Sequence, residues 1–247
     1  MKDYNYATQA EYYDIVEGNT NVKDFNNILN KLLKKYNIKS VLDITCGTGA
    51  QAIFLDKEGY KVTASDFSKE MIAIAQKKYP KLDFKQGDIR NAKYGKFDAV
   101  ISIFNAIGHL SKPDFGKAIR NITNNLKTGG IYIFDIFNLD FMKHGFIKEE
   151  FIDTLKEVDG TKFVRFNKNT FDSEGGVIHM NQKTYIQKGL SKPKIFKDSW
   201  DMQIYSSDEL KDILEKNGFE VLEFLDMNGD KFDKNKSLFI LTIARKK

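Results

Sequence analysis

A strand pattern that runs into a glycine-rich turn constrains this chain more than any other feature. Residues 41–45 are a mostly apolar strand pattern that contains Asp43, and they continue into Cys46-Gly47-Thr48-Gly49. A second strand pattern, 61–65, ends at Asp66. In parallel α/β sheets, the glycines of such a turn let the backbone approach a ligand, and a carboxylate after the second strand bonds ribose hydroxyls. The spacing therefore predicts a site for a nucleoside-containing cofactor.

Helix and strand patterns alternate along the first part of the chain. Apolar residues at helical spacing predict helices over residues 22–36, 49–57, 68–78 and 113–126. Strands are predicted over residues 40–45, 61–65, 82–86, 97–103 and 131–137. This order predicts an α/β fold, a doubly wound, Rossmann-like and mostly parallel sheet of seven strands whose ligand lies at their carboxyl ends.

The pattern changes from about Gly145. Alternating apolar and polar residues predict an inserted antiparallel sheet over residues 161–171, 176–187 and 194–204. A helix beginning at Ser206 or Ser207 and a C-terminal antiparallel hairpin, 219–227 with 238–244, then complete the core sheet. We therefore expect three parts. Residues 1–144 form a helical segment with the cofactor-binding core. Residues 145–205 form an insertion for substrate or oligomer contacts, and residues 206–247 form the closing helix and hairpin.

Composition excludes several classes of protein. The 247 residues are 41% hydrophobic, which suffices for a full core, and no apolar run is long enough to cross a bilayer or act as a signal peptide, so we expect a cytoplasmic protein. The single cysteine, Cys46, excludes an internal disulfide, and His144 and His179 lack partners at metal-ligand spacing. The net charge of +5 comes from lysines mixed with acidic residues, a pattern that indicates a solvated surface rather than a nucleic-acid-binding one.

The glycine turn belongs to a longer series of motifs, residues 41–49, 64–68 with Met71, 86–90, 97–100 and 126–130. The series resembles the class I S-adenosylmethionine-dependent methyltransferases over about Tyr4 to Phe137, although that family usually has proline at the position of Thr128. The turn also lacks the Lys-Ser or Lys-Thr of a P-loop and the third glycine of a dinucleotide fingerprint. S-adenosylmethionine is therefore the expected cofactor.

The resemblance implies roles for individual residues. In similar methyltransferases the position of Gly47 admits the methionine moiety, that of Asp66 binds the ribose, and those of Asp88 and Ile89 meet the adenine. Asp88 either contacts the adenine or caps a helix or turn. Tyr13 either covers the cofactor as a lid or packs in the core. The remaining expected cofactor positions are Asp43, Thr45, Gly49, Phe67, Met71 and Ile103.

Residues 102–110, with Asp3-Tyr4 and residues 10–14, resemble bacterial N-methyltransferases that act on nucleotide-linked amino sugars. The resemblance places His109 and Tyr4 at the reacting centre, with Tyr6 as a rival because of a one-residue gap. A histidine with a pKa of about 6.5 can accept a proton or orient an amine near neutral pH. A tyrosine can help to hold a cationic sulfonium. The alternative for His109 is a cap of the loop after the fourth strand.

Several different functions are compatible with this sequence. Glycine-type N-methyltransferases share the turn and the histidine, but they carry an arginine for the substrate carboxylate just after the fifth strand. Residues 135–138 of this chain contain no arginine, so Arg165 of the insertion is the candidate replacement.

Asp135, at the end of the fifth strand, faces either substrate or solvent. Residues 103–106 lack the motif of enzymes that methylate base amines. The fold pattern also suits an O-methyltransferase, a cofactor-binding sensor or scaffold, and a dehydrogenase. The expected function is methylation of a small molecule at an amine, by an enzyme whose relatives often use such insertions to form homodimers.

Overall fold

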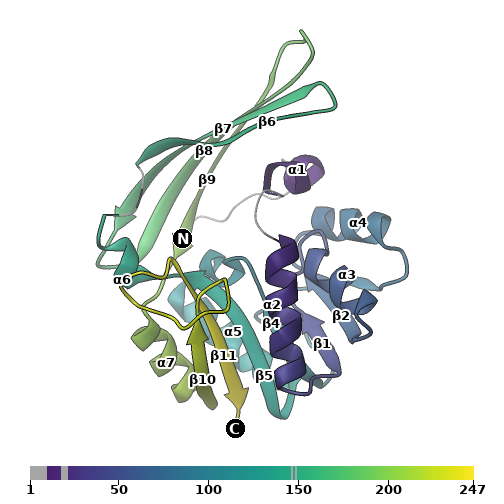
Figure 1. Cartoon of the computed structure of the whole chain (residues 1–247), viewed down its shortest axis with the longest axis vertical. Coiled ribbons are helices and arrows are strands. Elements are labelled where there is room, and N and C mark those ends of the chain that lie inside the picture. Colours follow the sequence, from purple (N-terminus) through teal and green to yellow (C-terminus); the bar gives the residue numbers. More distant parts are fainter. Residues whose placement is uncertain (1–9, 18–21, 146, 148) are drawn as a thin grey trace.

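The computed structural model describes residues 10–17, 22–145, 147 and 149–247, and Tyr4 and Tyr6 lie outside them. These residues form a seven-stranded sheet and a separate four-stranded sheet, as Figure 1 shows. The structure confirms the predicted fold class, a mostly parallel sheet with a C-terminal antiparallel hairpin and an inserted antiparallel sheet. No described helix has both the length and the apolar character needed to cross a membrane.

The seven-stranded sheet has the order β10-β11-β5-β4-β1-β2-β3. Its parallel strands are β1 (Ser40–Asp43), β2 (Lys61–Asp66), β3 (Phe84–Gln86), β4 (Phe97–Ser102) and β5 (Leu126–Phe137). The antiparallel edge consists of β10 (Phe219–Leu225) and β11 (Phe239–Lys246). After β3 the chain returns to the other side of β1, so the strand order reverses between β1 and β4. Ligands of such sheets bind where the order reverses, at the carboxyl ends of the strands.

Helices cover both faces of this sheet, and hydroxyl side chains begin several of them. The helices are η2 (Ala10–Tyr12), α1 (Tyr13–Glu17), α2 (Val22–Lys35), α3 (Ala50–Lys57), α4 (Lys69–Lys78), η3 (Ala106–His109), α5 (Lys112–Asn125), α6 (Leu139–Met142) and α7 (Ser207–Lys216). Ser68 caps α4 as predicted, Ser111 caps α5, and Ser206 with Glu209 forms a capping box at α7.

Alternation along β1 shows how the sheet is buried on both sides. Val41 packs with Leu29 and Leu33 of α2 on one face. Leu42, on the other face, belongs to the buried apolar cluster that includes side chains of α5 and α7. A strand that is apolar at successive positions is the expected consequence of two covered faces.

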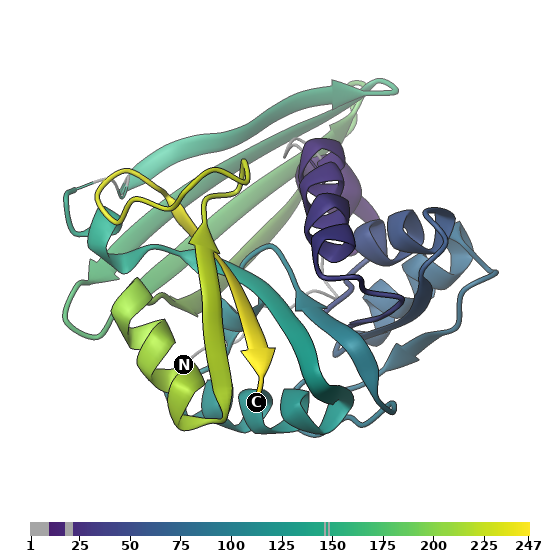
Figure 2. The same ribbon diagram turned by 60° about the horizontal axis from the view of Figure 1, so that its bottom comes forward.

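The four-stranded sheet consists of β6 (Glu150–Val158), β7 (Thr161–Asp172), β8 (Val177–Lys188) and β9 (Lys194–Gln203), in sequence order. It arches over α1, and Figure 2 shows its separation from the seven-stranded sheet in a second view. The strand predictions for β7, β8 and β9 are confirmed, whereas β6 has no counterpart among the predicted strands. Because β6 is an edge strand in which only Thr154 is buried, its sequence carries little apolar alternation.

Candidate active site

The glycine turn after β1 has one packed side and one open side. Gly47 and Gly49 both adopt left-handed backbone conformations, with φ of 52° and 88°. A Cβ atom added at Gly49 would lie 3.0 Å from the ring of Phe84, so this glycine permits close packing of the turn. A Cβ atom added at Gly47 would meet no described atom within 4 Å. The backbone at Gly47 is therefore open to a ligand.

Asp66 joins the end of β2 to this turn. Its Oδ2 accepts a hydrogen bond of 2.8 Å from the backbone N–H of Gly47, and its Oδ1 accepts one of 2.9 Å from that of Ser68. Burial raises the pKa of the Asp66 carboxyl, although these backbone donors act in the opposite direction. The structure thus brings together the two features from which the cofactor site was predicted.

Asp43 lies at the end of β1, close enough to Asp66 for the two carboxyls to influence each other. Only 2% of Asp43 is exposed, and its Oδ2 has no hydrogen-bond partner among the described residues. Burial and, secondarily, the charge of Asp66 raise the pKa of Asp43 to about 8. A nearby cation would favour the charged form of both carboxyls. S-adenosylmethionine carries a sulfonium and an ammonium group, so this pair of acids fits that cofactor.

The short helix α1 is fastened to the glycine turn. The hydroxyl of Thr48 donates a 2.6 Å hydrogen bond to Asp14, which also forms an ion pair with Lys78. Tyr13 precedes Asp14 and is half-buried. Thr45 lies on the other side of the turn, where its hydroxyl is 3.0 Å from that of Ser102 at the end of β4.

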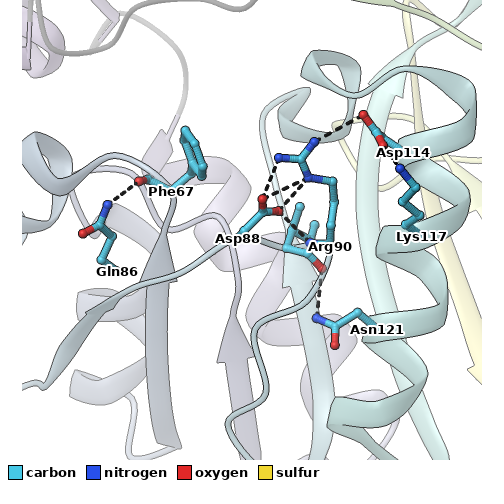
Figure 3. Close-up of polar contacts among 8 residues, drawn as sticks. Phe67, Gln86, Asp88, Arg90, Asp114, Lys117 and Asn121 are labelled. Carbon is cyan, nitrogen blue, oxygen red and sulfur yellow. Dashed lines mark hydrogen bonds and ion pairs between the residues drawn. The ribbon is translucent and has the colours of Figure 1, made fainter.

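Figure 3 shows the polar contacts after β2 and β3. The carboxylate of Asp88 accepts hydrogen bonds from the backbone N–H and the guanidinium of Arg90, which also reaches Asp114 of α5. Partial burial raises the pKa of Asp88, but the hydrogen bonds from Arg90 outweigh it and the net shift is downward. Asp88 therefore does cap the turn, and its contact with adenine remains a prediction. Phe67, at the same edge, is 69% exposed.

Three of the expected cofactor residues have buried side chains. Ile89 is 7% exposed, and its carbonyl accepts a 3.0 Å hydrogen bond from Asn121. Met71 is 1% exposed, and Ile103, at 6%, packs in the same apolar cluster as α2. Core packing accounts for much of the surface of these side chains, and their cofactor contacts remain predictions.

A buried carboxylate clamps the loop after β4. Phe104 and Asn105 both adopt left-handed conformations, with φ of 63° and 57°, which is uncommon for residues other than glycine. Asp135 at the end of β5 accepts hydrogen bonds from both backbone N–H groups, at 2.5 and 3.0 Å. Asp135 is fully buried, so the expectation of solvent contact is wrong. Burial raises its pKa to about 7, against the effect of the two backbone donors.

This clamped loop leads directly into the turn η3, which carries His109. His109 is half-buried. A Cβ atom added at Gly108 would lie 2.9 Å from Cγ of Met202 and 3.0 Å from Cδ1 of Ile136. The last strand of the insertion therefore packs tightly on the turn that presents His109. Sequence patterns missed both the clamp and this contact, and the one available signal was an acidic residue at the end of the fifth strand.

Arg165 does not have a free guanidinium. It is 7% exposed, and it forms hydrogen bonds of 2.8 and 2.9 Å with Asp153 and an ion pair with Glu17 of α1. Two carboxylates therefore already engage this arginine, which weakens its interpretation as an anchor for the carboxylate of an amino-acid substrate.

Neither a metal centre nor a reactive thiol emerges from the described part of the chain. It contains no group of three or more His, Cys, Asp or Glu side chains placed to hold a metal ion. His179 instead lies 2.8 Å from Asp201 on the four-stranded sheet. Cys46 is buried, and burial raises the pKa of its thiol, which agrees with a packing role.

The seven-stranded sheet with its antiparallel edge is a Rossmann-like fold of the class I methyltransferase type, and the candidate cofactor site lies at the ends of β1 and β2 beside the loop after β4. Residues 41–130 match the family described as a methyltransferase domain. The match covers about a third of the chain, and it agrees with the resemblance to class I S-adenosylmethionine-dependent methyltransferases and with S-adenosylmethionine as the expected cofactor.

Curated relatives share part of this sequence. A Streptomyces venezuelae protein, dTDP-3-amino-3,4,6-trideoxy-alpha-D-glucopyranose N,N-dimethyltransferase, is 33% identical over 38% of this chain and 40% of its own length. Glycine N-methyltransferase of Oryctolagus cuniculus is 31% identical over 44% of each chain. The matches thus span less than half of these relatives.

Similarity of fold extends over nearly the whole chain. The crystal structure of an S-adenosylmethionine-dependent methyltransferase from Clostridium acetobutylicum aligns with a TM-score of 0.83, covering 98% of each chain at 21% identity. At this identity the likeness shows the fold, and it includes the four-stranded sheet because the alignment omits so little of either chain.

Proposed function

We propose that this protein transfers a methyl group from S-adenosylmethionine to the amine of a small molecule, with an amino sugar as the favoured acceptor. The observation that carries the proposal is the open backbone at Gly47, tied to Asp66 and lying beside the buried Asp43. The loop that carries His109 begins at the neighbouring strand β4. A cofactor site and a candidate proton acceptor thus come from adjacent strands.

The chain's own residues divide the work of binding. The backbone at Gly47 admits the amino-acid part of the cofactor, Asp66 bonds the ribose, and Asp43 compensates positive charge. Asp88, Ile89 and Phe67 lie along the side expected to meet adenine. When bound, S-adenosylmethionine supplies an activated methyl group, so the protein's main task is alignment.

His109 is assigned to the acceptor side of the reaction. An amine must lose a proton when it is methylated, and a histidine can take that proton or orient the lone pair. The clamp from Asp135 and the packing of Met202 on Gly108 hold the turn that carries His109. Tyr4 and Tyr6 remain rival candidates for a second residue at this centre.

Two relatives point to different acceptors. The relative from Streptomyces is named for an amino-sugar substrate and the relative from Oryctolagus for glycine. Engagement of Arg165 by two carboxylates favours the amino sugar over an amino acid. We further propose that the insertion contributes to substrate choice and, as an alternative role, to a homodimer.

Calorimetric titration with S-adenosylmethionine, S-adenosylhomocysteine and NAD in parallel tests the cofactor. We expect micromolar binding of both adenosyl compounds and none of NAD. Binding of NAD alone would support a dehydrogenase, and binding without turnover on any amine would support a sensor or scaffold.

Two variants separate the assigned roles. His109→Ala should keep the affinity for S-adenosylhomocysteine and lower turnover about 100-fold or more, the usual size of a general-base contribution. Asp66→Ala should weaken cofactor binding instead, because the ribose loses a charged acceptor. Unchanged turnover in His109→Ala would remove the catalytic assignment.

A further inference from the structure

The four-stranded sheet has one face whose side chains are buried, which we call the inner face. Its members alternate with more exposed residues along β7, β8 and most of β9. They include Phe163, Arg165, Asn167 and Asn169 of β7, Ile178, Gln182, Thr184 and Ile186 of β8, and Trp200 and Met202 of β9. A buried sheet face is normally apolar, yet the middle of this one is polar.

Apolar contacts hold the inner face at both ends. At one end Phe163 and Ile186 pack against Val16 of α1. At the other end Ile178 and Met202 pack against α6. Between these contacts lie two cross-strand pairs, Arg165 with Thr184 and Asn167 with Gln182, and then Asn169 opposite Met180. We call the buried polar side chains between these two contacts the polar middle of the sheet. They are Arg165, Asn167, Asn169, Gln182 and Thr184.

Three oxygen atoms in this polar middle have no hydrogen-bond partner within the described part of the chain. They are Oδ1 of Asn169, Oε1 of Gln182 and Oγ1 of Thr184. The three residues are only 6%, 7% and 0% exposed. A buried polar atom without a partner is costly, and each such atom in a native structure requires an explanation.

The surrounding polar groups are bonded to one another, which makes these three oxygens stand out. Gln182 donates through its amide nitrogen to Asn167 at 3.1 Å, and Asn167 donates to Asp153 at 2.6 Å. Asp153 in turn binds Arg165, which also pairs with Glu17. The amide and guanidinium N–H groups thus donate to protein acceptors. The oxygens of Asn169, Gln182 and Thr184 remain available to accept hydrogen bonds from a ligand.

The inner face also leads to the predicted reacting centre. Met202 contacts the position of Gly108, immediately before His109. Trp200 lies two residues earlier on the same face of β9 and shares a cross-strand row with Met180 and Asn169. The polar middle thus begins one row beyond the contact with η3.

We infer that Asn169, Gln182 and Thr184 bind the acceptor substrate, and that this substrate is a polyhydroxylated amine rather than a carboxylate. Hydroxyl and ammonium groups donate hydrogen bonds, which is what Oδ1 of Asn169 and Oε1 of Gln182 require, and the hydroxyl of Thr184 can also accept one. A carboxylate would meet acceptors of its own kind, and the guanidinium of Arg165 is already neutralised. Gln182 and Thr184 are about 7 Å apart along β8, a separation that one sugar ring with its hydroxyls can span. This inference rests on the proposed function.

Binding to protein saturated with S-adenosylhomocysteine tests the inference without requiring turnover. Three probes are titrated by calorimetry. They are dTDP-3-amino-3,4,6-trideoxy-alpha-D-glucopyranose, D-glucosamine and glycine. We expect the wild type to bind at least one amino sugar and to prefer it to glycine.

Thr184→Val and Gln182→Leu should each raise the dissociation constant of the amino sugar about two- to tenfold, the usual effect of one hydrogen bond. The dissociation constant of S-adenosylhomocysteine should not change. Thr170→Val is the matched control, because Thr170 is an exposed threonine on the other face of β7. It should leave both constants unchanged.

Stability of the ligand-free protein gives a second readout. Because the hydroxyl of Thr184 meets no partner among the described residues, Thr184→Val should unfold at the same or a higher urea concentration than the wild type. A lower midpoint would show that this hydroxyl is bonded within the protein, and it would overturn the inference.

The remaining outcomes separate this inference from the proposed function. Normal methylation of an amino sugar with unchanged binding in both variants would overturn the inference and leave the proposed function standing. Binding of S-adenosylhomocysteine with a preference for glycine, or with no binding of either amino sugar, would also overturn it. Failure to bind S-adenosylhomocysteine at all would remove the proposed function itself.

Discussion

Replacing Gly108 with alanine tests how firmly the four-stranded sheet holds the turn that carries His109. The added Cβ would lie 2.9 Å from Cγ of Met202, 3.0 Å from Cδ1 of Ile136 and 3.2 Å from the carbonyl oxygen of Gln203. Ile136 is fully buried and the third neighbour is backbone, so neither can move freely.

The expected loss of stability follows from two opposing effects. Forcing an extra methyl group into a packed interior costs about 1–3 kcal/mol. Alanine also restricts the unfolded chain, which offsets about 0.4–1 kcal/mol of that cost. We therefore expect a net loss of about 1–2 kcal/mol, which at about 2–4 °C per kcal/mol for a chain of this size lowers Tm by about 2–8 °C.

Gly116→Ala is a matched control within α5. The nearest atom to its added Cβ is Nη1 of Arg120, at 3.7 Å, which is ordinary contact. Alanine in a helix interior is more favourable than glycine by about 0.5–1 kcal/mol, so this variant should be more stable than the wild type. The same chemical change should thus have opposite signs at the two positions.

Thermal unfolding and an assay of methyl transfer together check the reasoning. Gly108→Ala should also lower turnover while keeping the affinity for S-adenosylhomocysteine, because the altered turn carries His109, which we propose acts on the acceptor. If Gly108→Ala were as stable as Gly116→Ala, the close approach of β9 to η3 would not be a rigid contact, and the explanation for the position of His109 would fail.

Three further predictions concern stability. Burial raises the pKa of Asp135 to about 7 and, with help from Asp66, that of Asp43 to about 8. Both values lie above the unfolded value of about 3.9, so the ligand-free protein should lose stability as pH rises from about 5 to 8, by at most about 1.4 kcal/mol per pH unit for each carboxyl. Urea unfolding across this range should show a shallower loss in Asp135→Asn, and an unchanged slope would refute the assignment. For Asp98, bonds from Lys127 and Ser40 outweigh the effect of burial and lower the pKa to about 2. Asp98→Asn should therefore cost about 2 kcal/mol at neutral pH and approach the wild type below about pH 2, as acid unfolding would show. Ser206→Ala removes the capping box of α7 and should cost about 0.5–2 kcal/mol by the same measurement.

Local patterns predicted most of the elements because each pattern depends on neighbours in sequence. Period-two alternation revealed β7, β8 and β9, and Ser68 marked the start of α4. Local patterns also misplaced one boundary. The strand β5 begins at Leu126, whereas the sequence predicted residue 131 because the Gly129-Gly130 pair looks like a turn. The pair instead lies within the strand, whose pairing with β4 shifts register.

Contacts between distant residues could not be predicted in the same way. The carboxylate of Asp135 meets the N–H groups of Phe104 and Asn105 only because β4 and β5 are neighbours in the sheet. Arg165 was a candidate substrate anchor until α1 and β6 supplied Glu17 and Asp153. No spacing in the sequence distinguishes a free arginine from a paired one.

The sequence by itself determined the class of fold, the glycine turn with its partner Asp66 as the candidate cofactor site, and the identity of the histidine to test. These depend on short-range periodicity, on the backbone freedom of glycine and on motif spacing. Tertiary structure alone decided that Asp135 is a buried clamp, that Gly108 is a packing contact with β9, and that Asn169, Gln182 and Thr184 share one buried face. The physical reason is that burial and hydrogen-bond partners are properties of the packed chain, set by which elements meet after folding.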